Sequence, residues 1–217
     1  MLTLLSLPYS LPIMKFKIIS SVTMAALFAL SGCNEAPGNS SAGSSAKLAS
    51  TAVSIAAINV EAKGFTVGTP MSARTVYVFF DTQCPHCADL WVAAKPLINQ
   101  AKFVWIPVGI VNKSSTAQGA TLLAAKNPAA AMDAHETSMR AQQGGISAGS
   151  DIEAQRAVVA KNTELMTRFG FGSIPTIVAK HAQTGELVTQ EGSSSTAALA
   201  TFLGLQIPAG QPEVLAK

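Results

Sequence analysis

The sequence predicts an α/β domain with a central mixed β-sheet flanked by helices and carrying a helical insertion. Three observations lead to this prediction. Hydrophobic residues make up 48% of the 217 positions and charged residues only 12%, which suits one well-buried core. Short segments rich in β-branched and aromatic residues indicate strands. Longer segments with apolar residues at helical spacing lie between these strands and indicate the covering helices.

The chain begins with the pattern of a bacterial export signal. Residues 14–33 join a basic start, an apolar run too short to span a membrane, and small residues that end at Cys33. The last four of these, LSGC, resemble the lipobox at which signal peptidase cuts before the cysteine. We therefore expect residues 1–32 to be a lipoprotein signal peptide, with Met14 as the candidate true start, and Cys33 to be lipidated.

Residues 33–63 are predicted to be a lipidated N-terminus and flexible tether, because most of them are small or polar. The domain would occupy residues 64–205, followed by a tail at 206–217. These features predict a periplasmic protein that is lipid-anchored to a bacterial membrane. With Cys33 modified, the other two cysteines would lie in an oxidising compartment, where disulfides persist.

The charge balance argues against a nucleic-acid partner. The formal charge of the whole chain is +3, and two of its lysines lie in the expected signal peptide. After residue 33 the chain has 13 Lys and Arg against 12 Asp and Glu, which is a net +1. This leaves no basic stripe for a phosphate backbone, so nucleic-acid binding is excluded.

The first half of the domain has the order strand, helix, strand. TVYVFF at 75–80 is typical of a buried strand. Residues 85–100 show helical periodicity, with a kink expected at Pro96. FVWIPVGIV at 103–111 predicts the next strand.

A helical insert is predicted over residues 114–170. It is alanine-rich up to the flexible stretch AQQGGISAG, after which a second helix would be capped by Ser150, with Glu153 completing a capping box and Gly170 ending the helix. TIVAK and ELVTQEG then predict a hairpin. The segment STAALATFLGL predicts a terminal helix capped by a serine.

Cys84 and Cys87, in the stretch FFDTQCPHCADLW, allow three interpretations. A structural zinc site needs four ligands, but His86 lies between the cysteines, and the other two histidines, His135 and His181, lack ligand spacing. A passive disulfide would close so small a loop that it would add little stability. The third interpretation is a redox-active pair, which requires neither a metal nor an organic cofactor.

The local sequence favours the redox interpretation. At the start of a helix, residues i and i+3 lie on one face, close enough for a disulfide to form and break. Cys84 would lie at the helix N-terminus, where unpaired N–H groups and the helix dipole favour a thiolate and lower the thiol pKa. Pro85 fits the first helical position, and His86 would stabilise the anion further. Cys87, one turn into the helix, would be the resolving thiol.

A second part of the site is expected at Ile174 and Pro175, which precede the strand TIVAK. A proline at this position cannot donate to the sheet ladder. Either a cis bond presents the Ile174 backbone beside the cysteines, where it could pair with an extended client segment, or a trans proline begins the strand. The pattern alone leaves both alternatives open.

The motif CPHC after an apolar strand, with IPT before a later strand, resembles the thioredoxin fold, in which a cis-proline loop faces the CxxC helix. More narrowly, FFDTQCPHCADLW, WIPVGIV, AAKNPAAAMDAHE and GSIPTIV resemble the catalytic domains of DsbG- and DsbC-type periplasmic thiol:disulfide interchange proteins. The resemblance covers about residues 64–205. It implies that Cys84 is the attacking cysteine, Cys87 its resolving partner and Pro175 the cis-proline.

Two differences from those proteins bear on function. DsbG- and DsbC-type proteins have an N-terminal dimerisation domain, whereas only about 30 residues separate Cys33 from the catalytic part here, so a monomer is expected. Ile174 precedes the proline where those proteins tend to have threonine. The dipeptide Pro85-His86 resembles that of the oxidase DsbA.

Other residues have less specific interpretations. Asp81 could relay protons to the buried thiol or accept a hydrogen bond in a turn. Trp91 and Trp105 are expected to pack in the core. His135 and His181 are expected at the surface, without a chemical role. The segment GFG matches no nucleotide-binding motif and indicates a turn.

Together these features predict a lipid-anchored periplasmic thiol:disulfide oxidoreductase. Client proteins with thiols or disulfides would be its substrates, the CPHC pair would pass oxidising equivalents to them, and a redox partner in the inner membrane would recycle it. Two alternatives remain. One is a disulfide isomerase or reductase of the same family, and the other is a lipoprotein that binds peptides and uses its disulfide only for structure.

Overall fold

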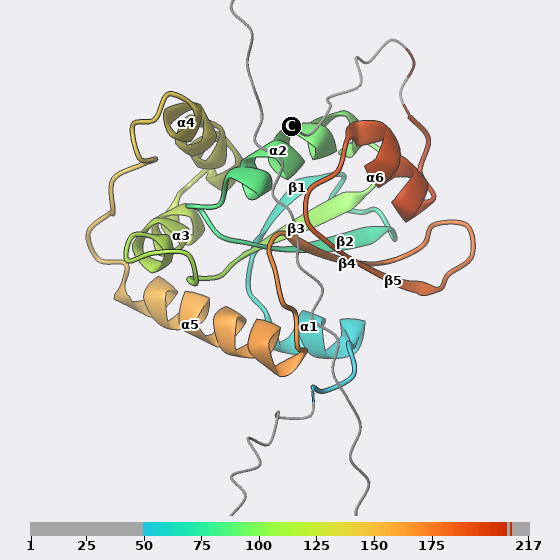
Figure 1. The fold of residues 1–217 in the computed structure, drawn as a ribbon, viewed down its shortest axis with the longest axis horizontal. Helices are drawn as coiled ribbons and strands as arrows, with labels where there is room; N and C mark the ends of the chain where they lie inside the picture. Colours follow the sequence, from blue (N-terminus) through green and yellow to red (C-terminus); the bar gives the residue numbers. More distant parts are fainter. Residues whose placement is uncertain (1–49, 208, 210–217) are drawn as a thin grey trace, which may run out of the picture. The chain divides into compact units, whose positions relative to one another are not determined.

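A five-stranded sheet lies at the centre of the computed structural model, which describes residues 50–207 and 209 (Figure 1). The strands are β1 (Phe65–Gly68), β2 (Thr75–Phe80), β3 (Lys102–Pro107), β4 (Thr176–Lys180) and β5 (Leu187–Glu191). Their order in the sheet is β1-β3-β2-β4-β5. β2 and β3 run parallel and every other pair is antiparallel. The predicted mixed sheet and the β4–β5 hairpin are confirmed.

Helices cover both faces of this sheet, as predicted. They are α1 (Ile55–Glu61), α2 (Pro85–Ala94), α3 (Ser115–Ala124), α4 (Pro128–Arg140), α5 (Glu153–Arg168) and α6 (Thr196–Leu203). α2 and α6 lie over one face, and α1 and α5 lie over the other (Figure 1). α3 and α4 form the first part of the predicted insert, between β3 and α5. None of the helices in the described part of the chain is both long enough and apolar enough to cross a membrane.

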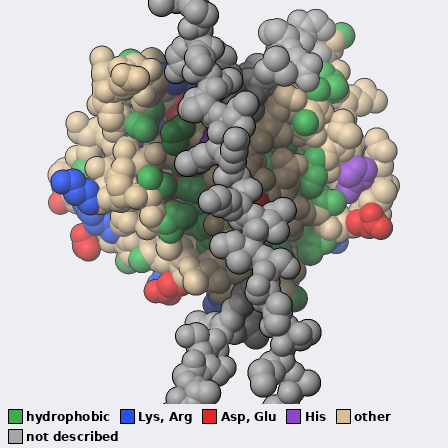
Figure 2. Space-filling model, in the orientation of Figure 1, with side chains coloured by type: hydrophobic (Ala, Val, Ile, Leu, Met, Phe, Trp, Pro, Cys, Tyr) green, Lys and Arg blue, Asp and Glu red, His purple; other side chains and the backbone are tan. Residues whose placement is uncertain are grey.

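The alternation of side chains along β2 divides the core into two layers. Val78 and Phe80 point toward the layer that contains α2, whereas Tyr77 and Phe79 point toward the layer that contains α5. Both layers are filled, so β2 is buried on both faces and its sequence is almost continuously apolar. On the face shown in Figure 2, the visible charged side chains lie mainly toward the rim, and hydrophobic ones lie nearer the middle.

An aromatic cluster fixes α2 against the sheet. The ring of Trp91 on α2 lies 5.0 Å from that of Trp105 on β3, with the planes 73° apart, and Phe80 meets Trp105 edge to face at 5.5 Å. Edge-to-face pairs of this kind contribute about 0.5–1.5 kcal/mol beyond the area they bury. Both tryptophans are buried, which confirms their predicted place in the core. The start of α2 is thereby held in a fixed position relative to the end of β2.

The predicted tether was too long at its C-terminal end. Residues 55–61 form α1, and Ile58 of this helix is buried in the layer that contains α5. Ser54 caps the helix by accepting the Ala57 N–H. The segment thus forms about two helical turns with one buried apolar residue. The predicted signal peptide, Cys33 and most of the predicted tail lie outside the described residues.

Two other boundaries also differ from the prediction. Ile152, rather than Ser150, occupies the N-cap position of α5, so the predicted capping box does not form. At its other end, α5 stops as predicted, since Gly170 has a left-handed φ of +74°. β3 ends at Pro107 instead of residue 111, because the N–H groups of Gly109, Ile110 and Val111 bond to side chains, the last two to a carboxylate described below.

Candidate active site

Asp81 forms the turn between β2 and α2. Its carboxylate is buried and accepts three backbone N–H groups, from Gln83 at 2.8 Å, Ile110 at 2.7 Å and Val111 at 3.0 Å. These bonds tie the turn to the loop after β3 and end that strand. They account for Asp81 as a hydrogen-bond acceptor in a turn, which is the second of its two predicted roles.

Cys84 occupies the N-cap position of α2 and Pro85 the first helical position, as the sequence predicts. The Cys84 carbonyl accepts the N–H groups of Cys87 at 3.1 Å and Ala88 at 3.3 Å. Proline is favoured at the first position because its missing N–H would have no intrahelical partner. The Cys84 thiol therefore lies where the unpaired N–H groups of the helix favour negative charge.

The pKa values of the two thiols are shifted in opposite directions. The pKa of Cys84 is lowered to about 7, first because the Cys87 thiol hydrogen-bonds to its sulfur, and despite an opposing effect of burial. The backbone N–H groups of Cys87 and His86 lower it further. Burial raises the pKa of Cys87 well above its ordinary value, and this side chain is 0% exposed. One sulfur of the pair thus ionises near neutrality while the other keeps its proton.

His86 contributes less to this ionisation than its place in the motif suggests. Its charge is the weakest of the effects that lower the pKa of Cys84. The imidazole is largely exposed, and its Nδ1 lies 4.0 Å from a carboxylate oxygen of Asp89. Exposure to water screens its influence on the sulfur.

The loop before β4 brings the second predicted part of the site to the cysteines. The Ile174–Pro175 bond is cis, which resolves the alternative that the sequence left open. The Ile174 carbonyl oxygen lies 3.7 Å from Cys84 Sγ. Glu191 on β5 holds this loop by accepting the Gly172 N–H at 3.1 Å and the Ser173 hydroxyl at 2.9 Å. Two segments that are 90 residues apart in the sequence therefore meet at one sulfur.

His135 is buried, so its predicted surface location was wrong. Its side chain is 0% exposed and contacts Thr82, two residues before Cys84. Its neighbour Glu136 is also buried, and burial raises the pKa of its carboxyl to about 8. Met132, His135 and Glu136 share one face of α4 at i, i+3 and i+4 spacing, and this pattern could have revealed their burial.

No group of three or more Cys, His, Asp and Glu side chains within residues 50–207 and 209 could hold a metal ion.

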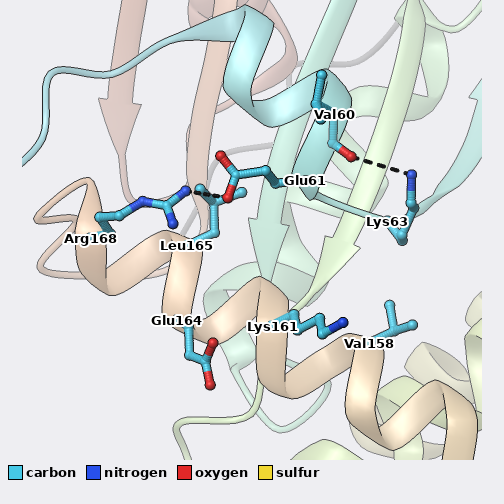
Figure 3. A pocket seen from close by; sticks show the side chains of 8 residues that line it. All are labelled: Val60, Glu61, Lys63, Val158, Lys161, Glu164, Leu165 and Arg168. Atoms are coloured by element: carbon cyan, nitrogen blue, oxygen red, sulfur yellow. Dashed lines mark hydrogen bonds and ion pairs between the residues drawn. The ribbon is translucent and has the colours of Figure 1, made fainter.

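His181 lies at the β4–β5 turn, where its Nδ1 accepts N–H groups from Gln183 and Thr184. A groove with charged residues lies between α1 and α5, with a volume of about 490 Å³ (Figure 3). Glu61 and Arg168 form an ion pair across it, and no cysteine lines it.

A family model for thioredoxin matches residues 61–197 of the chain. The thiol:disulfide interchange protein DsbG of Pseudomonas aeruginosa is 34% identical over 140 residues, which are 63% of this chain and 54% of that protein. DsbG of Escherichia coli is 33% identical over 104 residues, 47% of this chain and 42% of that protein. The chain thus spans about half the length of these relatives.

The crystal structure of Pseudomonas aeruginosa DsbA2 resembles this structure with a TM-score of 0.52. The two sequences are 20% identical, and the match covers 64% of this chain and 91% of that one. At this level of identity the likeness concerns the fold alone.

Proposed function

The chain belongs to the thioredoxin family, and from this premise we propose that it is a periplasmic thiol:disulfide oxidoreductase acting on client proteins. The observation that carries the proposal is the asymmetry of the cysteine pair. The Cys84 thiol has a pKa of about 7, whereas the pKa of Cys87 is raised by burial. A purely structural disulfide has no need of a sulfur that ionises near neutrality.

The proposed reaction is thiol–disulfide exchange in two steps. A client thiolate attacks Cys84 Sγ of the Cys84–Cys87 disulfide, and Cys87 leaves and takes up a proton. A second client thiolate then attacks the client sulfur of this mixed disulfide, and Cys84 leaves as a thiolate. The client loses two electrons and gains a disulfide, while the cysteine pair gains two electrons and becomes a dithiol.

The acidity of Cys84 favours this oxidising direction. A thiol of low pKa is a good leaving group, so the second step is fast. Stabilising the thiolate also stabilises the reduced pair, which makes its disulfide a stronger oxidant. In the opposite direction, Cys84 would attack client disulfides and Cys87 would resolve the adduct, as in an isomerase or reductase.

The remaining site residues would serve this exchange. The Ile174 backbone, beside Cys84 Sγ, would pair with an extended client segment. Pro175 would shape this loop, Pro85 would set the start of α2, and His86 would add modestly to thiolate stability.

We also propose that the protein is exported and held at a membrane through a lipid on Cys33, acts as a monomer, and is recycled by a redox partner in the inner membrane. The signal-like pattern that ends in LSGC supports the export and the lipid anchor. Cells grown with labelled palmitate should label the parent chain but not a Cys33→Ser variant. Absence of label from the parent chain, or equal labelling of the two, would contradict lipid anchoring.

The exchange itself is tested with Cys87→Ala and Cys84→Ala variants in cells. In Cys87→Ala, Cys84 can still attack client disulfides, but no Cys87 sulfur releases the adduct, so mixed disulfides with clients should accumulate and can be identified by mass spectrometry. Cys84→Ala, the matched control, should accumulate none. Equal adducts in both variants, together with no oxidation of a reduced test protein by the parent chain, would favour the peptide-binding lipoprotein.

The direction of exchange requires a separate measurement. Rapid acid quenching followed by alkylation of free thiols reports the redox state of the pair in cells. A mostly oxidised pair is expected for an oxidase. A mostly reduced pair would indicate the isomerase or reductase alternative.

A further inference from the structure

The imidazole of His135 makes a hydrogen bond at each nitrogen. Nε2 lies 2.7 Å from the Thr82 carbonyl oxygen, and Nδ1 accepts the Ile146 N–H at 3.2 Å. A carbonyl oxygen can only accept, so Nε2 must carry the proton, and Nδ1 must be bare. The buried ring is therefore neutral, in agreement with a pKa that burial lowers. The ring connects the turn before Cys84 to a loop that follows α4.

The side chain of Gln83, the residue after Thr82, also bonds to the loop that follows α4 and to α3. Its Nε2 donates to Gln118 Oε1 at 2.6 Å and to the Gly144 carbonyl at 3.2 Å, and its Oε1 accepts from Asn112 at 3.0 Å. Gln118 in turn donates to the carbonyls of Gly144 at 2.8 Å and Ile146 at 2.9 Å. Hydrogen bonds from the insert thus hold both residues that separate Asp81 from Cys84.

The loop that completes this network depends on two glycines. Gly144 and Gly145 both have left-handed φ values, +82° and +85°. A Cβ atom at Gly145 would lie 2.3 Å from Cε1 of His135, so only glycine lets the backbone reach the ring. The stretch AQQGGISAG, which was predicted to be flexible, therefore packs closely against the imidazole.

We propose that His135 is a positioning residue, which fixes the turn before Cys84 by donating a hydrogen bond to the Thr82 carbonyl. This inference rests on the proposed function, since its consequence is the reactivity of Cys84. The Cys84 N–H bonds to the Asp81 carbonyl at 3.1 Å, so a rotation of the turn would move the N-cap of α2. Holding Thr82 keeps Cys84 Sγ at the helix N-terminus and beside the Ile174 carbonyl.

Two conservative substitutions separate the two bonds of the ring. In His135→Gln the side-chain N–H₂ can take the place of Nε2 and still donate to Thr82. In His135→Asn the amide oxygen can take the place of Nδ1 and accept from Ile146, but it cannot reach Thr82. Ultraviolet absorbance of the thiolate, followed against pH in the reduced protein, gives the pKa of Cys84 in each variant.

His135→Asn is expected to raise the pKa of Cys84 by about 0.5 unit, which lowers the ionised fraction at pH 7 about twofold. His135→Gln should stay within about 0.2 unit of the parent chain. The matched control is Asn162→Leu, because Asn162 is equally buried and bonds to Lys63 and Pro107 in the other layer. It should lower stability without moving the pKa of Cys84.

The titration requires no client, so its outcome is independent of turnover. If the parent chain oxidises no test protein while His135→Asn still shifts the pKa, the proposed function fails and the positioning role stands. If neither His135→Asn nor His135→Leu moves the pKa relative to the parent chain, the positioning role is overturned. His135→Leu, which removes both bonds, also serves where His135→Asn does not fold.

Discussion

Replacing Cys87 with alanine is expected to raise the pKa of the Cys84 thiol. The hydrogen bond from Cys87 is the largest of the effects that lower this pKa to about 7. Hydrogen bonds to charged groups contribute about 1.5–3 kcal/mol, and 1.36 kcal/mol corresponds to about one pKa unit. Loss of the bond should therefore move the pKa by about 1–2 units, to about 8–9.

The rate of alkylation by iodoacetamide, measured against pH, reports this change. At pH 7 about half of Cys84 is ionised in the parent chain, and a rise of one unit would leave about a tenth ionised. The less acidic thiolate is about threefold more nucleophilic, since its reactivity rises with a slope of about 0.4–0.5 per pKa unit. The net rate at pH 7 should fall about twofold, while the plateau at high pH should rise about threefold.

Cys87→Ser is the matched control, because its hydroxyl can donate to the Cys84 sulfur in place of the thiol. Its alkylation midpoint should stay near pH 7. A midpoint near pH 7 in Cys87→Ala as well would refute the assignment of this hydrogen bond as the main cause. The helix N-terminus would then have to account for most of the acidity.

Three further outcomes are expected. In the same titration, His86→Ala should raise the pKa of Cys84 by about 0.5 unit or less, because the exposed imidazole contributes least; a shift equal to that of Cys87→Ala would contradict this order. In urea unfolding, Trp105→Ala should lower the free energy of unfolding by about 3–5 kcal/mol, because the 0% exposed indole would leave a cavity beneath α2. Lys95→Met should cost less than about 1 kcal/mol in the same assay, since its ion pair with Asp133 is half-exposed; a larger cost would show that this pair anchors α4.

The local parts of the candidate site could be predicted from the sequence. The i, i+3 spacing of the cysteines and a proline at the first helical position depend on one helical turn, so neighbouring residues determine them. β2 is buried on both faces, and its composition showed this directly. The glycine that ends α5 is likewise a local signal.

The non-local parts could not be predicted in the same way. The burial of His135 depends on a loop with two left-handed glycines that folds back onto the ring, and no short window contains both. The end of β3 depends on a carboxylate about 30 residues earlier, which takes the N–H groups of Ile110 and Val111. The hydrogen bond from Cys87 that lowers the pKa of Cys84 is likewise non-local in origin. Cys87 can donate it because burial keeps this thiol protonated, and that burial depends on the packed structure.

The burial of Cys87 controls how long the protein stays joined to a client. Its sulfur can cut the link between Cys84 and a client only as an anion, and its raised pKa keeps that anion scarce near neutrality. During this delay, a second cysteine of the client has time to reach the same link and complete its own disulfide. A residue that never meets solvent would thus decide whether an encounter ends with the client oxidised or released unchanged.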